Sequence, residues 1–183
     1  MRVVFAALVA LTLSACQTTL TLPGYQPTSS QSITGEVREV KSTYTPPKGV
    51  KENQIRNTAV GTILMTEPVP TYVTNAFRLE LRGAGVKLGN GRCEVLLTIR
   101  DYAAEDLGFN ITYISDINYE LVAPTPAFRK NVRISFTTDK FLDASLILAS
   151  LRDVLAKNFD DVLRDPGFNS AIKKYCQPTA PGA

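Results

Sequence analysis

Residues 109–122 read FNITYISDINYELV, and this stretch decides the fold class. Apolar and polar side chains alternate along most of it, and the apolar residues that share one face are Ile111, Tyr113, Ile117, Tyr119 and Leu121. Such alternation is typical of an antiparallel β-strand with one face on a core and the other in water. The two tyrosines could form a recognition surface. Because aliphatic residues share their face, we expect both tyrosines to pack in the core instead.

Weaker or shorter strand patterns lie on both sides of this segment. The sequence CEVLLTIRDY predicts a strand around residues 94–102, and alternating apolar residues predict another at 132–136. Before them, residues 33–43 and 58–65 are consistent with two further strands, separated by the loop sequence YTPPKGVKENQ. These segments together predict a sheet of consecutive strands.

Helical periodicity appears in three places. Apolar residues recur with helical spacing over residues 70–84, and Gly83 and Gly85 mark the end of this helix. A second helix, with a long apolar stripe, is predicted to start at Asp143. Asp165 followed by Pro166 has the sequence of an N-cap and first-turn proline, which opens a last short helix. We therefore expect an α+β fold, an antiparallel sheet with two or three helices packed on one face, in a single domain spanning residues 33–176.

The N-terminus has the parts of a secretory signal. Arg2 supplies a positive charge, and an apolar run of about eleven residues follows it, well short of the roughly 20 needed to span a membrane. The sequence LSAC at residues 13–16 resembles the lipobox of bacterial lipoproteins. This resemblance implies removal of residues 1–15 as a lipoprotein signal peptide and acylation of Cys16, which anchors the chain in a membrane. The alternative is a plain signal peptide followed by a chance cysteine.

The segments that flank the domain are polar. Residues 16–32 carry no charge and are rich in Thr, Ser, Gln and Pro, so we expect a lipidated N-terminus and a flexible tether. Residues 177–183, QPTAPGA, are expected to form a disordered tail. Gln17 follows the anchor where an Asp would favour retention in the inner membrane, which points to the outer membrane and its periplasmic face.

Composition narrows the class of protein. The 183 residues include 20 Lys and Arg against 17 Asp and Glu, a near balance that argues against a nucleic-acid binder. Once Cys16 is acylated, Cys93 and Cys176 remain. In an oxidising compartment they are a natural disulfide pair. Two unpaired thiols are the alternative, since sequence alone does not show that their Cα atoms approach.

The chain also resembles the YajG-like family of bacterial outer-membrane lipoproteins, over roughly residues 60–175 and the lipobox. The sequences that carry the resemblance are NAFRLELRGAGVKL, CEVLLTIRDY, ITYISDINYELVA and ASLILASLRDVLAKNFDDVLRDPGF. They match in periodicity more than in fixed functional residues. The resemblance implies a periplasm-facing lipoprotein and carries over no catalytic motif.

The residues offer little catalytic chemistry. There is no histidine to act as a base, two thiols are too few for a structural zinc site, and we expect no metal or cofactor. Asp101, Glu105 and Asp106 are the best carboxylate cluster, and a glycan hydrolase could in principle use two of them. A solvated hairpin explains them better, because no apolar pocket is evident that would favour a protonated acid.

Two basic clusters are candidate binding residues. Lys48, Lys51 and Arg56 are expected in one loop, and a second cluster is expected at the start of a strand; its members are Arg129, Lys130 and Arg133. Either could contact lipid headgroups, anionic glycan or a partner, although solubilising charges on turns are the simpler interpretation.

We therefore expect a non-enzymatic outer-membrane lipoprotein that binds or supports an envelope protein or the cell wall. A small-ligand or glycolipid binder is the alternative, and a glycan hydrolase is a third.

Overall fold

A computed structural model describes residues 22, 24–58, 62–139 and 144–178. The elements, in chain order, are β1 (Glu36–Tyr44), β2 (Gln54–Asn57), β3 (Ile63–Leu64), α1 (Val69–Gly83), β4 (Lys87–Leu88), β5 (Cys93–Asp106), β6 (Asn110–Val122), β7 (Pro126–Asp139), α2 (Ala144–Leu163) and α3 (Pro166–Tyr175). None of these helices is long and apolar enough to cross a membrane. The expected α+β class is confirmed.

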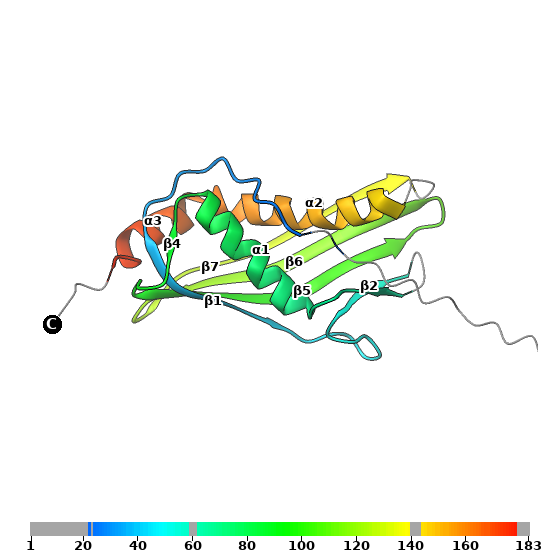
Figure 1. Ribbon diagram of the computed structural model, residues 1–183, viewed down its shortest axis with the longest axis horizontal. Helices are drawn as coiled ribbons and strands as arrows, with labels where there is room; N and C mark the ends of the chain where they lie inside the picture. Colours follow the sequence, from blue (N-terminus) through cyan, green and yellow to red (C-terminus); the bar gives the residue numbers. More distant parts are fainter. Residues whose placement is uncertain (1–21, 23, 59–61, 140–143, 179–183) are drawn as a thin grey trace, which may run out of the picture.

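The described strands form one mixed sheet of seven strands (Figure 1). The long strands β5, β6 and β7 are antiparallel, as their alternation predicts. The expectation of a wholly antiparallel sheet needs correction, because β1 pairs in parallel with β4 and β5, and β2 in parallel with β5. Parallel neighbours need a crossover connection. The chain supplies it by passing through α1 between β1 and β5.

All three helices cover one face of this sheet, as Figure 1 shows for α1 and α2. Phe77 of α1 packs against both Tyr119 of β6 and Phe159 of α2, with ring centroids 5.5 and 5.1 Å apart. Tyr113 and Tyr119 are buried there, so they are core residues. The other face of the sheet carries no helix among the described residues, and we call it the helix-free face.

Local sequence signals explain how the helices begin and end. The carboxylate of Asp165 accepts hydrogen bonds from the backbone N–H groups of Gly167 and Phe168, at 2.7 and 3.3 Å, which caps α3 as predicted. Gly85, just beyond α1, has φ +90°, a conformation that glycine adopts at no steric cost.

The start of the sheet differs from the prediction. A strand was expected over residues 58–65, but β3 covers only Ile63–Leu64, and residues 59–61 lie outside the described part. The preceding strand, β2, was not predicted: its first residue, Gln54, was placed in the loop, and its other three residues precede the predicted strand. Ile55 is its single fully buried side chain, so pairing with β5 rather than local apolar pattern makes this segment a strand.

A disulfide joins Cys93, the first residue of β5, to Cys176, the residue after α3. Their Cα atoms lie 5.2 Å apart, and 83 positions separate them in the sequence. The bond therefore ties the last helix to the centre of the sheet. Close by, Pro178, in the expected disordered tail, pairs with Gly91, and residues 179–183 of that tail lie outside the described part.

Candidate functional site

Residues 24–32, the last part of the expected flexible tether, lie fixed on the helices, while residues 16–21 and 23 lie outside the described part. We call residues 24–32 the strap. The Tyr25 side chain is buried, and its ring packs edge-on against Phe159 of α2 with centroids 5.9 Å apart. The strap continues into Ile33, whose N–H donates to the carbonyl of Ala84 at 2.7 Å. Figure 1 shows this segment running over the helical layer. Burial of the Tyr25 ring in this otherwise polar stretch contributes to its order.

Glu80 of α1 holds the strap. This residue is 1% exposed, and its carboxylate accepts hydrogen bonds from the Tyr25 hydroxyl at 2.6 Å and from the N–H groups of Thr28 and Ser29 at 2.8 and 2.9 Å. The Thr28 hydroxyl adds a fourth bond at 3.1 Å. Burial, followed by the hydrogen bond to Glu80 and its charge, raises the pKa of Tyr25 far above its usual range. A buried carboxylate is thus solvated by the strap, and the strap is positioned by the carboxylate.

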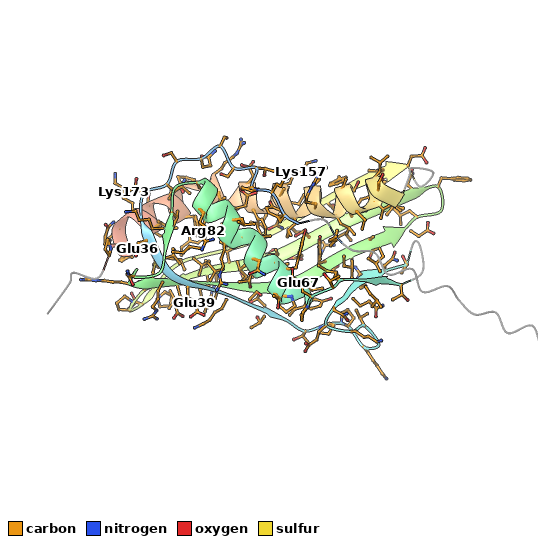
Figure 2. All side chains as sticks on the ribbon, in the orientation of Figure 1. Glu36, Glu39, Glu67, Arg82, Lys157 and Lys173 are labelled. Atoms are coloured by element: carbon orange, nitrogen blue, oxygen red, sulfur yellow. A yellow bond between two sulfur atoms is a disulfide. The ribbon has the colours of Figure 1, made fainter. Side chains whose placement is uncertain are left out.

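A pocket of about 370 Å³ lies where the strap begins, beside the N-terminal half of α1. Leu22, Met65 and Leu79 give it apolar walls, while Glu67, labelled in Figure 2, lies on its lining. Tyr72 also lines it and is 5% exposed, and its hydroxyl has no hydrogen-bond partner among the described residues. Burial raises the pKa of Tyr72 to about 12, so this hydroxyl stays a donor at neutral pH.

The helix-free face is a polar surface that crosses the long strands. Register places Thr43, Thr98, Asn118 and Asn131 in one cross-strand row, and the side chains of directly paired residues share a face. On one side of this row, Arg129 donates to Glu120 at 2.9 Å. This face therefore combines hydrogen-bonding groups with charges that are paired to each other.

The carboxylates singled out from the sequence lie on this face and are bound by an arginine. Arg56 makes a two-point contact with Asp101, at 3.1 and 2.7 Å, and approaches Glu105 at 2.6 Å. Asp116 lies directly opposite Asp101 in the sheet and is bound by Arg133 at 3.1 Å. The hydrogen bond from Arg56 to Asp101 is the main cause that raises the pKa of Arg56. Alternating charges thus stabilise two carboxylates that would otherwise repel each other.

Asp106, the third predicted carboxylate, has a different role. It accepts from the N–H of Gly108 in the turn between β5 and β6. The predicted carboxylate cluster is therefore divided between an arginine contact and a turn.

The predicted basic clusters do not stay together. Lys48 and Lys51 are exposed in the loop before β2, but Arg56 belongs to β2 itself and not to that loop.

In the second cluster, Arg129 and Arg133 lie on the helix-free face. Lys130 points to the other side, where it contacts Asp161 at 2.6 Å and Asp165 at 2.9 Å. Successive strand residues point to opposite faces, so the period of two already separates Lys130 from its neighbours. Cys16, the predicted lipidation site, lies outside the described residues.

An exposed apolar hairpin tip is a feature that the sequence analysis missed. Leu107 is 63% exposed and Phe109 75% exposed, on either side of Gly108 between β5 and β6. Gly108 has φ +90°, and its N–H donates to Asp106 at 2.7 Å, so the turn has a defined shape. The sequence signal that could have predicted this tip is a pair of large apolar residues on either side of a glycine, between two predicted strands.

Comparisons with known proteins identify the fold and no more. No protein-family model matches the chain, and no curated protein matches it. A crystal structure of a Xanthomonas campestris protein of family DUF330 has a TM-score of 0.62 at 8% identity, covering 80% of this chain and 92% of that one. A second crystal structure, of an uncharacterized protein, has a TM-score of 0.56 at 11% identity, covering 80% and 95%. The chain shares their fold, and its resemblance to YajG-like lipoproteins stays a prediction.

Proposed function

We propose that this chain is a non-enzymatic lipoprotein, anchored by acyl chains on Cys16 to the periplasmic face of the outer membrane. We propose further that its helix-free face binds another component of the cell envelope. The lipobox-like sequence at residues 13–16 supports the anchor. Several acyl chains hold a domain stably at a membrane, since each buried CH₂ contributes about 0.8 kcal/mol.

The observation that carries the binding role is the polar row on the helix-free face. Thr98 and Asn131 are exposed, and they lie in the same row across the centre of the long strands. The neighbouring charges are already paired, as in Arg129 with Glu120. The Asn131 NH₂ group already donates to Asp116 at 2.8 Å. A partner would therefore meet the Thr98 hydroxyl and the Asn131 amide oxygen between paired charges, an arrangement that favours a specific polar contact over general attraction.

The same pairing argues against the glycan hydrolase. That reaction needs one of two carboxylates as a protonated acid, which enzymes obtain by placing it in an apolar pocket. Asp101 and Glu105 instead share Arg56, which contacts both of them. Neither carboxylate has the surroundings of a general acid.

Site-specific crosslinking in cells tests the binding role. A photoreactive residue at position 98 or 131 should give the same discrete protein adduct, or an adduct with cell wall. Position 173 is the matched control, because Lys173 is an exposed residue of α3, away from this face (Figure 2). Adducts of equal strength from position 173, or none from 98 and 131, would contradict the proposed surface. Intact mass of the membrane-extracted protein, compared with a Cys16→Ser variant, tests the anchor independently.

The pocket beside the strap supports a second candidate, a small-ligand or glycolipid binder. Among the described residues the buried Tyr72 hydroxyl has no hydrogen-bond partner, so a ligand oxygen that reached it would gain a favourable bond. Native mass spectrometry of protein extracted in mild detergent checks this candidate. A bound small molecule that is lost in Tyr72→Phe would favour it, and a ligand-free wild type would count against it.

A further inference from the structure

Exposed apolar side chains gather at one end of the molecule. Of the large apolar side chains that the structure describes, the most exposed are Leu107, Phe109 and Leu146. The first two form the tip between β5 and β6, and Leu146 lies in the first turn of α2. Asn110 pairs with Asp139 at the end of β7, a few residues before α2 begins, so all three lie at the same end, as Figure 1 shows for their elements. This end therefore carries the most exposed large apolar side chains of the described surface.

The strap leads the chain toward this same end. Thr28 and Ser29 contact Glu80 near the C-terminal end of α1, whereas Leu22 lies with Tyr72 near its N-terminal end. The strap therefore runs from the disulfide end toward the hairpin end as residue numbers fall.

The reach of the preceding chain fits the distance that remains. Met65 lines the same pocket as Leu22, and its N–H donates to the carbonyl of Asn53 at 2.7 Å. Asn53 lies three residues before Arg56, which pairs in parallel with Ala103, so Leu22 lies near the level of Tyr102. From Tyr102 to Gly108 the strand rises about 20 Å at roughly 3.3 Å per residue. The chain between Cys16 and Leu22 spans at most about 20 Å when fully extended. An acylated Cys16 would therefore hold the hairpin end close to the bilayer.

We propose that the tip formed by Leu107, Gly108 and Phe109 inserts into the membrane surface beside the lipid anchor. This inference rests on the proposed acylation of Cys16. A turn that exposes an aromatic and an aliphatic side chain matches the chemistry of the headgroup and upper acyl region, where such side chains leave water while the polar backbone stays near the headgroups.

The chain suits a labelling experiment, because an introduced cysteine would be its single reactive thiol. Cys93 and Cys176 are bonded to each other, and Cys16 carries acyl chains in the proposed form. Full-length lipidated protein with Phe109→Cys or Leu107→Cys is labelled with an environment-sensitive fluorophore. It is then placed in phosphatidylethanolamine–phosphatidylcholine vesicles that contain a bilayer-depth quencher. Lys173→Cys, at the opposite end of the molecule, is the matched control (Figure 2).

The inference predicts a blue-shifted emission that is quenched from within the bilayer at positions 107 and 109, with neither effect at position 173. Emission at 107 and 109 like that at 173, in protein whose intact mass shows acylation, overturns the tip inference and leaves the anchor standing. Absence of acyl groups from the intact mass overturns the proposed anchor and this inference with it. A tip that is exposed to water in vesicles but protected from thiol reagents in whole envelopes meets a protein instead, which also overturns the inference.

Discussion

Replacing Glu80 by Gln tests whether the strap is held as the structure indicates. In the wild type, one carboxylate oxygen accepts from the Tyr25 hydroxyl and from the N–H and hydroxyl of Thr28, and the other accepts from the N–H of Ser29. A Gln amide can keep its oxygen toward Tyr25 and Thr28, but its NH₂ group then faces the N–H of Ser29. In the variant two donors, the NH₂ of the new amide and the Ser29 N–H, therefore face each other where the wild type has a charge-assisted hydrogen bond.

The size of the effect follows from these bonds. A hydrogen bond to a charged group contributes about 1.5–3 kcal/mol, and the bonds that the neutral amide keeps fall to about 1 kcal/mol each. At the lower end of these ranges the changes add up to roughly 3 kcal/mol, so we expect E80Q to weaken the strap by at least that much. If strap opening is local, that change makes the Thr28 and Ser29 amides exchange with solvent about 100-fold faster, since each 1.4 kcal/mol is a factor of ten.

Hydrogen exchange measured residue by residue is the assay. Amides in β5 and β6 should keep their wild-type rates, because the strap opens without unfolding the sheet. Glu67→Gln is the matched control, since the Glu67 carboxylate accepts from the side chain of Asn75 at 3.4 Å rather than from the strap. Unchanged exchange at positions 28 and 29 in E80Q, or wild-type strap amides as fast as those of the loop at residues 45–53, would refute the reasoning.

Three further predictions concern the core, the disulfide and the cap of α3. Replacing Cys93 and Cys176 by Ser should lower the free energy of unfolding by about 4.5 kcal/mol, the chain-entropy value for a closed loop of this length. Urea denaturation with and without reductant checks this, and a wild type insensitive to reductant would contradict it. Asn158 is fully buried, donates to the carbonyls of Ser115 and Val132 at 2.9 Å and accepts from the Tyr119 hydroxyl at 2.6 Å. Asn158→Leu should therefore lower the free energy of unfolding by about 2–4 kcal/mol in the same assay, because it leaves buried polar groups without hydrogen-bond partners. A loss below about 1 kcal/mol would show that these bonds are replaceable. The hydrogen bond from Lys130, followed by those from Gly167 and Phe168, lowers the pKa of Asp165. The stabilisation that ionised Asp165 contributes is therefore complete above the pKa of an unfolded Asp, near 4, and is lost as the pH falls below it. The Tm difference between wild type and Asp165→Asn should then shrink from pH 7 to pH 3. A difference that stays constant would argue against the ion pair.

Local patterns predicted the long elements because their causes are local. The alternation in residues 109–122 and the Asp165-Pro166 cap each depend on neighbours within a few positions, and both appear in the structure. The split of Lys130 from Arg129 was also predictable, since adjacent residues of a strand face opposite sides. Treating them as one basic cluster ignored that period.

The strap could not be predicted in the same way. Its order depends on Glu80, which lies 51 to 55 positions later in the sequence. On α1 this residue looks like any polar residue of an amphipathic helix, and its burial follows from the strap that covers it. Tyr25, a single large ring in a polar stretch, was the one local sign. The parallel pairing of β1 and β2 with β5 likewise depends on where the chain returns after α1.

The strap and the tip together determine how the proposed lipoprotein would stand on its membrane. An anchor that leaves the domain near the N-terminal end of α1 and a tip that inserts at the end of β5 place both membrane contacts at one end. The strands would then run away from the bilayer rather than along it. β5 has 14 residues, which rise about 45 Å, so the Cys93–Cys176 end would reach deep into the periplasm. The helix-free face would stand upright, with the Thr98 and Asn131 row beyond the headgroups. A partner that binds this row can therefore be a neighbouring envelope protein or the cell wall.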